Sequence, residues 1–312
     1  MSDPRAPAVL VYEPGICRGI PASEYHAWDI ASRSMLTKLA DTRHYTPADV
    51  RHEMLTAKPD TDALALGSAL HVALLEPARY AKAVAIGPVN PKTGRTYGRD
   101  TKAWEEAEHA GDTAVLLTTD QATKVPLMAA ALRAHPQARA IFERATEREL
   151  SVVVNLDLDE LAAEHGVGDY WRLRSDDDAQ LLAKARLDML CPDVALVADL
   201  KTSVAATEWE LRKSVTDYGY YQQSALYPYM ARAAGFGDVR HFALVVVRSE
   251  EPYRAAVLRV TEESQRIGWQ ELLPAMALAA RCYRLDDWPG WPEGVIDVDV
   301  AEWKLREVRC MH

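Results

Sequence analysis

The fold is decided by two short stretches, Lys184-Ala-Arg-Leu-Asp-Met-Leu190 and Val197-Ala-Asp-Leu-Lys-Thr202. Both contain apolar runs with the length and composition of a strand. Pro192 and Asp193 lie between them and are typical of a turn. The two stretches therefore predict a β-hairpin.

The alternation of side chains along a strand determines which polar groups meet. Because this alternation has a period of two, Asp199 and Lys201 share one face, whereas Leu200 points into the core. Asp188, near the end of the paired strand, can reach the same point. Two carboxylates and an ammonium group suit Mg²⁺ or Mn²⁺, which are hard ions that prefer oxygen ligands. Such a site can activate water for attack on a phosphate.

The same Asp-x-Lys pattern also occurs as an ordinary ion pair at a strand edge, where it contributes little to stability. Its surroundings favour the metal site. The motif lies in an apolar run, where unpaired charges are costly, and Asp188 precedes Asp199 by eleven residues. A helix that carries glutamine and tyrosine follows.

Composition limits the class of protein. The chain has 312 residues, of which 48% are hydrophobic, enough for one large domain or two small ones. It has no apolar run of membrane-spanning length, and its first residues do not resemble an export signal. The four cysteines lack the spacing of zinc ribbons or iron–sulfur clusters, which fits a reducing cytoplasm: Cys17, Cys191, Cys282 and Cys310.

The net charge of −10 argues at first against a nucleic-acid partner. However, residues 141–178 hold eleven acids and four bases, so much of the negative charge is local. A basic surface elsewhere is compatible with this distribution. Residues 157–178 predict an acidic, mobile insert on the surface. Residues 1–20 are rich in proline and predict an extended segment before a single domain over residues 21–312.

Two helices are predicted before the hairpin. Ser32 or Ser34 caps the first, and either hydroxyl also suits a contact with a backbone phosphate. The second covers residues 60–75, is apolar nearly all round and should be buried. Gly67 and His71 lie on one face of it. His71 is therefore either a satisfied core histidine or, if the helix packs against the carboxylates, a metal or phosphate ligand.

Residues 87–104 predict a loop rich in glycine and proline, with basic and aromatic side chains interleaved. This composition suits a nucleic-acid backbone with stacked bases, and it suits a solvated loop equally well. The basic side chains of the loop are Lys92, Arg95, Arg99 and Lys102.

After the hairpin, a helix over residues 218–230 places Gln223 and Tyr227 on one face. An ordinary amphipathic helix has the same spacing. The tail contains Trp288, and it is expected to pack on the domain or to touch DNA. Two strands and a long helix lie between, over residues 241–247, 253–260 and 262–284.

Five motifs in this order resemble the PD-(D/E)XK nucleases, and within them the phage RecE-type (exodeoxyribonuclease VIII-like) exonucleases. The likeness spans roughly residues 20–305. It departs from the family pattern in two places, because no proline precedes Asp188 and the acidic insert is longer than expected. The motifs are Ser32-x-Ser34-x-Leu36, Gly67-Ser-Ala-Leu-His71, Arg186-Leu-Asp188, Asp199-Leu-Lys201-Thr202 and Gln223-Ser-Ala-Leu-Tyr227.

The resemblance implies a restriction-endonuclease-like α/β core, in which helices flank a central mixed β-sheet. Asp188 and Asp199 match the metal-binding carboxylates, and Lys201 matches the catalytic lysine. His71 and the Leu200 carbonyl complete the implied metal site. The residues that support catalysis are Gln223 and Tyr227, and the candidate DNA contacts are Arg186, Ser34, Arg95, Arg99 and Lys102.

The implied activity is 5′→3′ degradation of one strand of linear duplex DNA, which leaves 3′ single-stranded tails for recombination. It depends on Mg²⁺, which Mn²⁺ can replace. The implied partners are a RecT-like single-strand annealing protein and further copies of the chain in a ring around DNA. We expect a cytoplasmic protein of a bacterial host, encoded by a phage or prophage. Two alternatives stay open: a structure- or site-specific endonuclease of the same fold, and a catalytically inactive DNA-binding relative.

Overall fold

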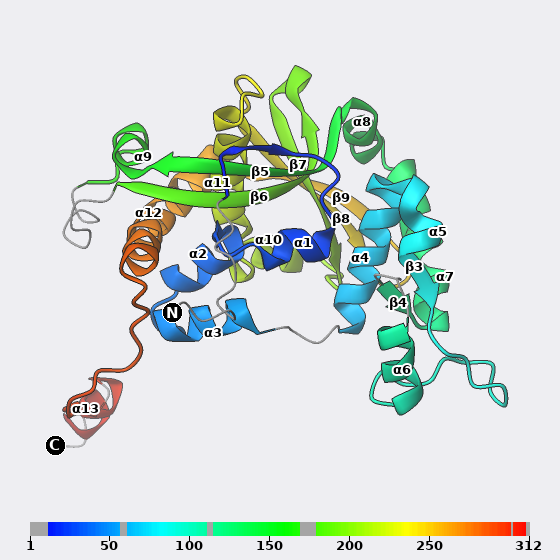
Figure 1. Ribbon diagram of the computed structural model, residues 1–312, viewed down its shortest axis with the longest axis horizontal. Helices are drawn as coiled ribbons and strands as arrows, with labels where there is room; N and C mark the ends of the chain where they lie inside the picture. The colour runs from blue at the N-terminus through cyan, green and yellow to red at the C-terminus, as the bar shows by residue number, and fades with distance from the viewer. Residues whose placement is uncertain (1–11, 57–60, 111–114, 169–178, 301, 310–312) are drawn as a thin grey trace, which may run out of the picture.

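The computed structural model describes residues 12–56, 61–110, 115–168, 179–300 and 302–309 (Figure 1). A seven-stranded sheet forms its centre. The strands of this sheet are β1 (Gly15–Cys17), β2 (Ala31–Ser32), β5 (Glu147–Asp157), β6 (Gln180–Cys191), β7 (Leu196–Ser203), β8 (His241–Arg248) and β9 (Ala255–Arg259). Their order is β1-β5-β6-β7-β8-β9, with β2 beside β6. The sheet is mixed, because β7 pairs with β8 and β2 with β6 in parallel while the other pairs are antiparallel.

The predicted hairpin is confirmed. Pro192–Val194 form a short 3-10 turn between β6 and β7, and the two strands pair with Met189 opposite Ala198 and Cys191 opposite Leu196. The hairpin occupies the middle of the sheet, where both faces are covered. This position explains why its polar residues stand in otherwise apolar runs.

Helices cover both faces of the sheet, as expected for the restriction-endonuclease-like α/β fold (Figure 1). One core, around Leu36 and Leu226, lies under α2 (Arg33–Ala40), α9 (Leu158–His165), α11 (Tyr220–Ala233) and α12 (Glu262–Leu285). The other core, around Leu70 and Met128, lies under α4 (Asp62–Leu75), α7 (Thr119–Ala134) and α8 (Pro136–Arg144). The remaining elements are α1 (Ala22–Ala27), α3 (Pro47–Leu55), α5 (Tyr80–Ala83), α6 (Lys102–Ala110), α10 (Glu208–Asp217), α13 (Glu302–Arg309), and the two-stranded sheet of β3 (Val84–Ile86) and β4 (Val115–Leu117).

Local sequence signals set the ends of the two helices that matter most for the site. The Ser32 hydroxyl accepts a hydrogen bond from the Met35 amide and so caps α2. Thr61 caps α4 in the same way, and α4 ends at Leu75, two residues before Pro77. The apolar side of α4 is buried against the sheet, as predicted, and this packing brings His71 to the end of β7.

The predicted acidic insert differs from expectation in its first half. Residues 158–165 form α9, whose Leu158 and Leu161 are fully buried in the core. The acids lie on the outer side of a packed helix, so this part is no mobile excursion; residues 169–178 lie outside the described residues. The predicted N-terminal extended segment contains β1, which pairs with β5. Both cores share one sheet, which supports our proposal that residues 21–312 form a single domain.

Candidate active site

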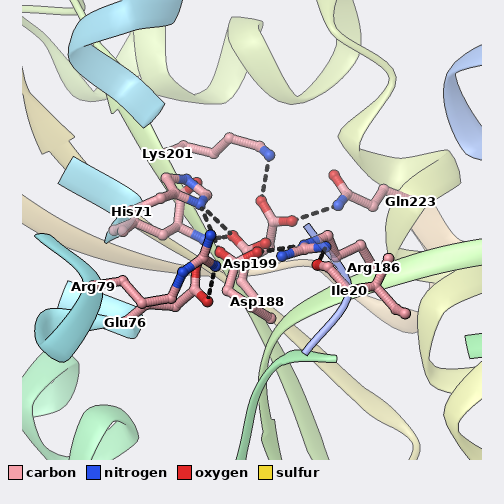
Figure 2. A network of polar contacts seen from close by, with 11 residues as sticks. Ile20, His71, Glu76, Arg79, Arg186, Asp188, Asp199, Lys201 and Gln223 are labelled. Carbon is pink, nitrogen blue, oxygen red and sulfur yellow. Dashed lines mark hydrogen bonds and ion pairs between the residues drawn. The ribbon is translucent and has the colours of Figure 1, made fainter. Parts of the chain in front are cut away.

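The two aspartates of the hairpin lie side by side. Continuing the register from the Met189–Ala198 pair places Asp188 opposite Asp199, and both are buried, with 7% and 2% exposure. Asp188 Oδ2 accepts a hydrogen bond of 2.8 Å from the Leu200 amide. This hydrogen bond connects β6 to β7 and fixes the Asp188 carboxylate next to Asp199 (Figure 2).

Donors from two elements hold the Asp199 carboxylate. On β7 itself, Lys201 Nζ lies 2.5 Å from Asp199 Oδ2. From α11, Gln223 Nε2 donates a hydrogen bond of 2.6 Å to Asp199 Oδ1. Lys201 also lies 5.4 Å from the centre of the Tyr220 ring, a distance suited to a cation–π contact. The predicted sharing of one strand face by Asp199 and Lys201 is therefore confirmed.

His71 reaches the same point from α4. Its Nε2 lies 2.9 Å from the Leu200 carbonyl oxygen, and its Nδ1 lies 3.4 Å from Glu149 Oε1 and 3.6 Å from Asp188 Oδ2. The helix packs against the carboxylates, which is the condition for the ligand interpretation. Both ring nitrogens also have protein partners, so the role of His71 as a ligand stays a prediction. The two groups predicted as neutral metal ligands, His71 and the Leu200 carbonyl, are in direct contact.

Glu149 is a site residue that the sequence interpretation missed. It lies on β5 in line with Asp188 on β6, and its backbone has a φ of +48°. That left-handed conformation is uncommon for a residue with a side chain and often marks a functional position. Its place in the site depends on the register between β5 and β6, and the periodicity of the sequence alone does not fix that register.

The charges of the site are strongly interdependent. Burial, together with the Asp199 carboxylate, raises the pKa of Asp188. Burial lowers the pKa of His71, but Asp188 and Glu149 outweigh it and raise that pKa to about 9. Burial also opposes the charge on Glu149, yet His71 and Arg186 hold the pKa of Glu149 below its usual range. For Lys201, Asp199 outweighs burial and raises the pKa, so the ammonium form is favoured.

The donor set fits a divalent cation. His71, Glu149 and Asp188 each offer a ligand atom, and these atoms lie within 4.8 Å of one another. Asp199 Oδ2 is buried and receives no aligned hydrogen bond from the described residues, although Lys201 lies beside it. Carboxylate and carbonyl oxygens with one imidazole nitrogen suit Mg²⁺ or Mn²⁺. A bound cation would also offset the repulsion that raises the pKa of Asp188.

The remaining predicted catalytic residue, Tyr227, lies one turn after Gln223 on α11. Its ring packs edge-on against Phe242, with 6.3 Å between ring centres. Burial raises its pKa well above the ordinary value. Within the described part of the chain its hydroxyl makes no hydrogen bond to the site, so the structure places Tyr227 as packing behind Gln223.

Arg186 does not lie where a phosphate contact requires it. Its Nε lies 2.5 Å from Glu149 Oε2, its Nη1 donates to the Ile20 carbonyl, and its side chain is only 11% exposed. The guanidinium is engaged in a buried ion pair with Glu149, so this arrangement gives the predicted DNA contact no support, and that contact stays a prediction. A sequence does not reveal whether an arginine already has an acidic partner.

The basic residues predicted in the loop over residues 87–104 differ in their exposure. Arg99 is a structural residue, since it contacts Asp62 at 2.8 Å, stacks on the Trp104 ring at 4.7 Å and is only 17% exposed. Its predicted DNA contact therefore stays a prediction. Lys102 is 87% exposed and pairs with Glu106, and Arg95 is exposed. Both remain candidate contacts, Arg95 in the loop before α6 and Lys102 at the first position of α6.

The start of α2 contributes a second missed residue. Ser34 is exposed there, with its hydroxyl 3.3 Å from that of Ser32, so it stays available as predicted. Arg33, between them, donates to the Tyr218 carbonyl and to Gln223 Oε1 at 3.2 and 3.3 Å. It thereby links α2 to the glutamine that holds Asp199, and a phosphate near Ser34 would meet this guanidinium.

Comparison with known families gives this arrangement a context. Residues 32–296 match the model of the PDDEXK-like domain of unknown function, DUF3799. The chain belongs to this family. The match includes every motif residue of the site, from Ser32 and His71 to Gln223, and it confirms the predicted PD-(D/E)XK superfamily.

A solved structure agrees in fold. The chain superposes with a TM-score of 0.55 on a crystal structure from Eubacterium rectale described as a putative exonuclease. The two are 12% identical, and the match covers 91% of this chain and 95% of the other. No curated protein matches the sequence. Family membership and the shared restriction-endonuclease-like fold support a nuclease, that is, a DNA hydrolase.

One further finding concerns the membrane. In the part of the chain that the structure describes, no helix combines the length and the apolar character needed to cross a bilayer. The longest described helix, α12, packs its buried side mainly against α2, α9 and α11.

Proposed function

We propose that this PDDEXK-like protein is a metal-dependent 5′→3′ exonuclease that degrades one strand of linear duplex DNA and leaves 3′ single-stranded tails. The observation that carries the proposal is the convergence of Asp188, Asp199, the Leu200 carbonyl and His71 on one point, with Lys201 beside it. Carboxylates that share a buried point with a lysine suit phosphodiester hydrolysis. The exonuclease polarity is supported by the RecE-type motifs.

In the proposed mechanism, one or two Mg²⁺ ions, or Mn²⁺ in their place, would be held by Asp188, Asp199, the Leu200 carbonyl and His71. A bound ion of this kind lowers the pKa of a water and neutralises charge on the phosphate. Glu149 positions His71, because it faces the imidazole Nδ1 and leaves Nε2 directed at the Leu200 carbonyl. Metal-binding histidines commonly have such a carboxylate partner.

Lys201 acts next to this point as a charged donor. Since Asp199 favours its ammonium form, Lys201 orients the attacking water and stabilises negative charge that develops on the phosphate. Gln223 holds Asp199 from the opposite side through Oδ1, which keeps Oδ2 directed at Lys201. Attack in line with the leaving 3′ oxygen then breaks the phosphodiester bond.

The same motifs support a wider role. We propose that the 3′ tails pass to a RecT-like annealing protein in the bacterial cytoplasm, and that the chain is encoded by a phage or prophage. A ring of copies around DNA would reconcile the net charge of −10 with DNA binding, because only the channel needs a positive surface.

The test is digestion of linear duplex DNA labelled separately at its 5′ and 3′ ends, with closed circular DNA alongside. We expect early release of the 5′ label with Mg²⁺, intact circles, and no cleavage by Lys201→Ala within the time that the wild type needs for digestion. Cut circles would move the function to an endonuclease with the same site. A lack of cleavage with Mg²⁺ or Mn²⁺ would contradict the nuclease itself and favour an inactive DNA-binding relative.

A further inference from the structure

The chain leaves its core at a defined point after α12. Trp288 packs edge-on against Tyr283, with 5.1 Å between ring centres, and Arg51 of α3 lies 5.2 Å from the Trp288 ring. The Ala48 amide donates to the Pro289 carbonyl at 3.2 Å. These contacts fix the tail to α3 up to Pro289, and everything beyond it starts from this anchor.

Beyond the anchor the tail exposes an unusual amount of apolar surface. All of residues 291–300 are exposed, including Trp291 at 86%, Val295 at 97% and Val298 at 84%. Figure 1 shows the tail and α13 standing away from the body of the molecule. Single exposed apolar residues are common, but a contiguous set of this kind marks an interaction surface.

The sequence of this segment is that of a strand. From Ile296 to Val300, isoleucine and valine alternate with Asp297 and Asp299, which puts the apolar residues on one face and the acids on the other. Yet within the described residues this segment pairs with no strand. A strand pattern without a partner requires a sheet edge from elsewhere.

Strand β9 offers such an edge. It is the last strand of the sheet, next to β8. The backbone amide and carbonyl groups of its even-numbered residues point toward β8, as the backbone hydrogen bonds from the Arg248 amide to the Arg254 carbonyl and from the Val260 amide to the Phe242 carbonyl show. The amide and carbonyl groups of Ala255, Val257 and Arg259 therefore point outward. Among the described residues they have no backbone partner. An unpaired edge of this kind is a template for an added strand.

The two surfaces are complementary in charge. Residues 293–302 contain four acids and no lysine or arginine, whereas residues 253–260 contain Arg254 and Arg259 and no acid. Neither arginine forms an ion pair within the described chain, and neither do Asp297 and Asp299. Both surfaces thus have unpaired charges of opposite sign beside unsatisfied strand positions.

We propose that the tail strand, residues 295–300, adds to the free edge of β9 in a second copy of this chain. The tail leaves beside α3 and α12, on the opposite side of the molecule from α7 and α8, which pack near β9 (Figure 1). Two different surfaces on opposite sides make a head-to-tail contact, and such contacts close into rings when the rotation allows. The inference concerns assembly and holds whether or not the chain is a nuclease.

Charge exchange provides the test. The mass of the full chain in solution would be measured by light scattering and sedimentation for the wild type, for Asp297→Lys/Asp299→Lys, for Arg254→Glu/Arg259→Glu, and for all four changes together. We expect a multiple of 34.7 kDa for the wild type, 34.7 kDa for each pair of changes alone, and recovery of the larger mass in the fourfold variant. All four positions are exposed, so folding should be retained, and circular dichroism checks this.

Controls separate this contact from a general effect of charge. Glu24→Lys/Glu105→Lys changes the net charge by as much as Asp297→Lys/Asp299→Lys does, but at exposed sites elsewhere. This control should leave the mass of the assembly unchanged. Val298→Asp, on the apolar face of the tail, should reduce the mass without a charge reversal. A monomeric wild type, a mass insensitive to both paired variants, or a fourfold variant that stays monomeric would overturn the proposal. So would loss of binding to an annealing protein in the tail variant with no change in mass.

Discussion

Replacement of Glu149 by glutamine is a strong perturbation, because Glu149 balances a buried charge. The Glu149 and Arg186 side chains are 12% and 11% exposed, and their charged atoms are 2.5 Å apart. Without the carboxylate, Arg186 keeps, among the described residues, a hydrogen bond to the Ile20 carbonyl and a contact with the Tyr25 ring, neither of which carries a negative charge. Breaking a buried pair by removal of one member costs about 3–5 kcal/mol, and we expect Glu149→Gln to lower the free energy of unfolding by about that much.

The expected cost comes from the uncompensated charge of Arg186. Glu149→Gln/Arg186→Met removes both charges, and such apolar replacements of buried pairs are often neutral, so the double variant should recover most of the loss. Glu147→Gln is the matched control. It lies two residues away on β5 and breaks a pair with Arg18 that is 59% exposed on the arginine side, so its cost should be below about 1 kcal/mol.

The assay is unfolding by urea at neutral pH with a chelator present, so that metal binding does not contribute. A Glu149→Gln protein within about 0.5 kcal/mol of the wild type, or a double variant no more stable than the single one, would refute the reasoning. The folded double variant then serves in a titration with Mn²⁺. Loss of a positioning carboxylate typically lowers metal affinity about 10–100-fold, and unchanged affinity would mean that Glu149 does not position His71.

Three further predictions concern single residues. Folding raises the pKa of His71 from 6.5 to about 9. The protonated imidazole therefore stabilises the fold fully below pH 6.5, and this stabilisation is lost as the pH rises through about 9. The melting temperature of the metal-free protein should fall across this pH range, and it should fall less in His71→Gln. Lys201→Met should slow cleavage on the order of 10²–10³-fold while Mn²⁺ affinity, measured by calorimetry, does not decrease; a rate near wild type would contradict its role. Arg99→Ala should cost roughly 1–3 kcal/mol in chemical unfolding, whereas Lys102→Ala should change stability by less than about 0.5 kcal/mol, and equal effects would contradict the structural role of Arg99.

Much of the site follows from short-range patterns. The hairpin around Asp188 and Asp199 is a local structure, so strand length, turn chemistry and alternation were enough to predict that Asp199 and Lys201 share a face. The position of His71 needed one long-range fact, the packing of α4 on β7, which the apolar character of that helix suggested and the resemblance to a nuclease family supported. These elements were predicted because their signals are contained in their own sequence.

The rest depended on register and pairing, which single residues do not encode. Glu149 enters the site only because β5 pairs with β6 in one register. From the sequence, Arg186 and Arg99 are expected to contact DNA. Both side chains are largely buried, and each pairs with an acid from another element, Arg186 with Glu149 and Arg99 with the exposed Asp62. In the same way, the acidic composition around residues 157–165 led to the prediction of a mobile insert, although α9 has an apolar face that packs on the core. Net charge and composition describe what is exposed on average and do not locate individual partners.

The central claim is that Asp188, Asp199, His71 and Lys201 form a metal-dependent phosphodiesterase site. The most direct measurement compares Mg²⁺-dependent hydrolysis of linear duplex DNA by the wild type, by Asp199→Asn and by Asp193→Asn. Asp193 makes the matched control, because the same change falls in the same hairpin, at an exposed turn where it only breaks a pair with Arg144. We expect loss of hydrolysis in Asp199→Asn alone, with its DNA binding retained. Equal hydrolysis by all three proteins would contradict the claim.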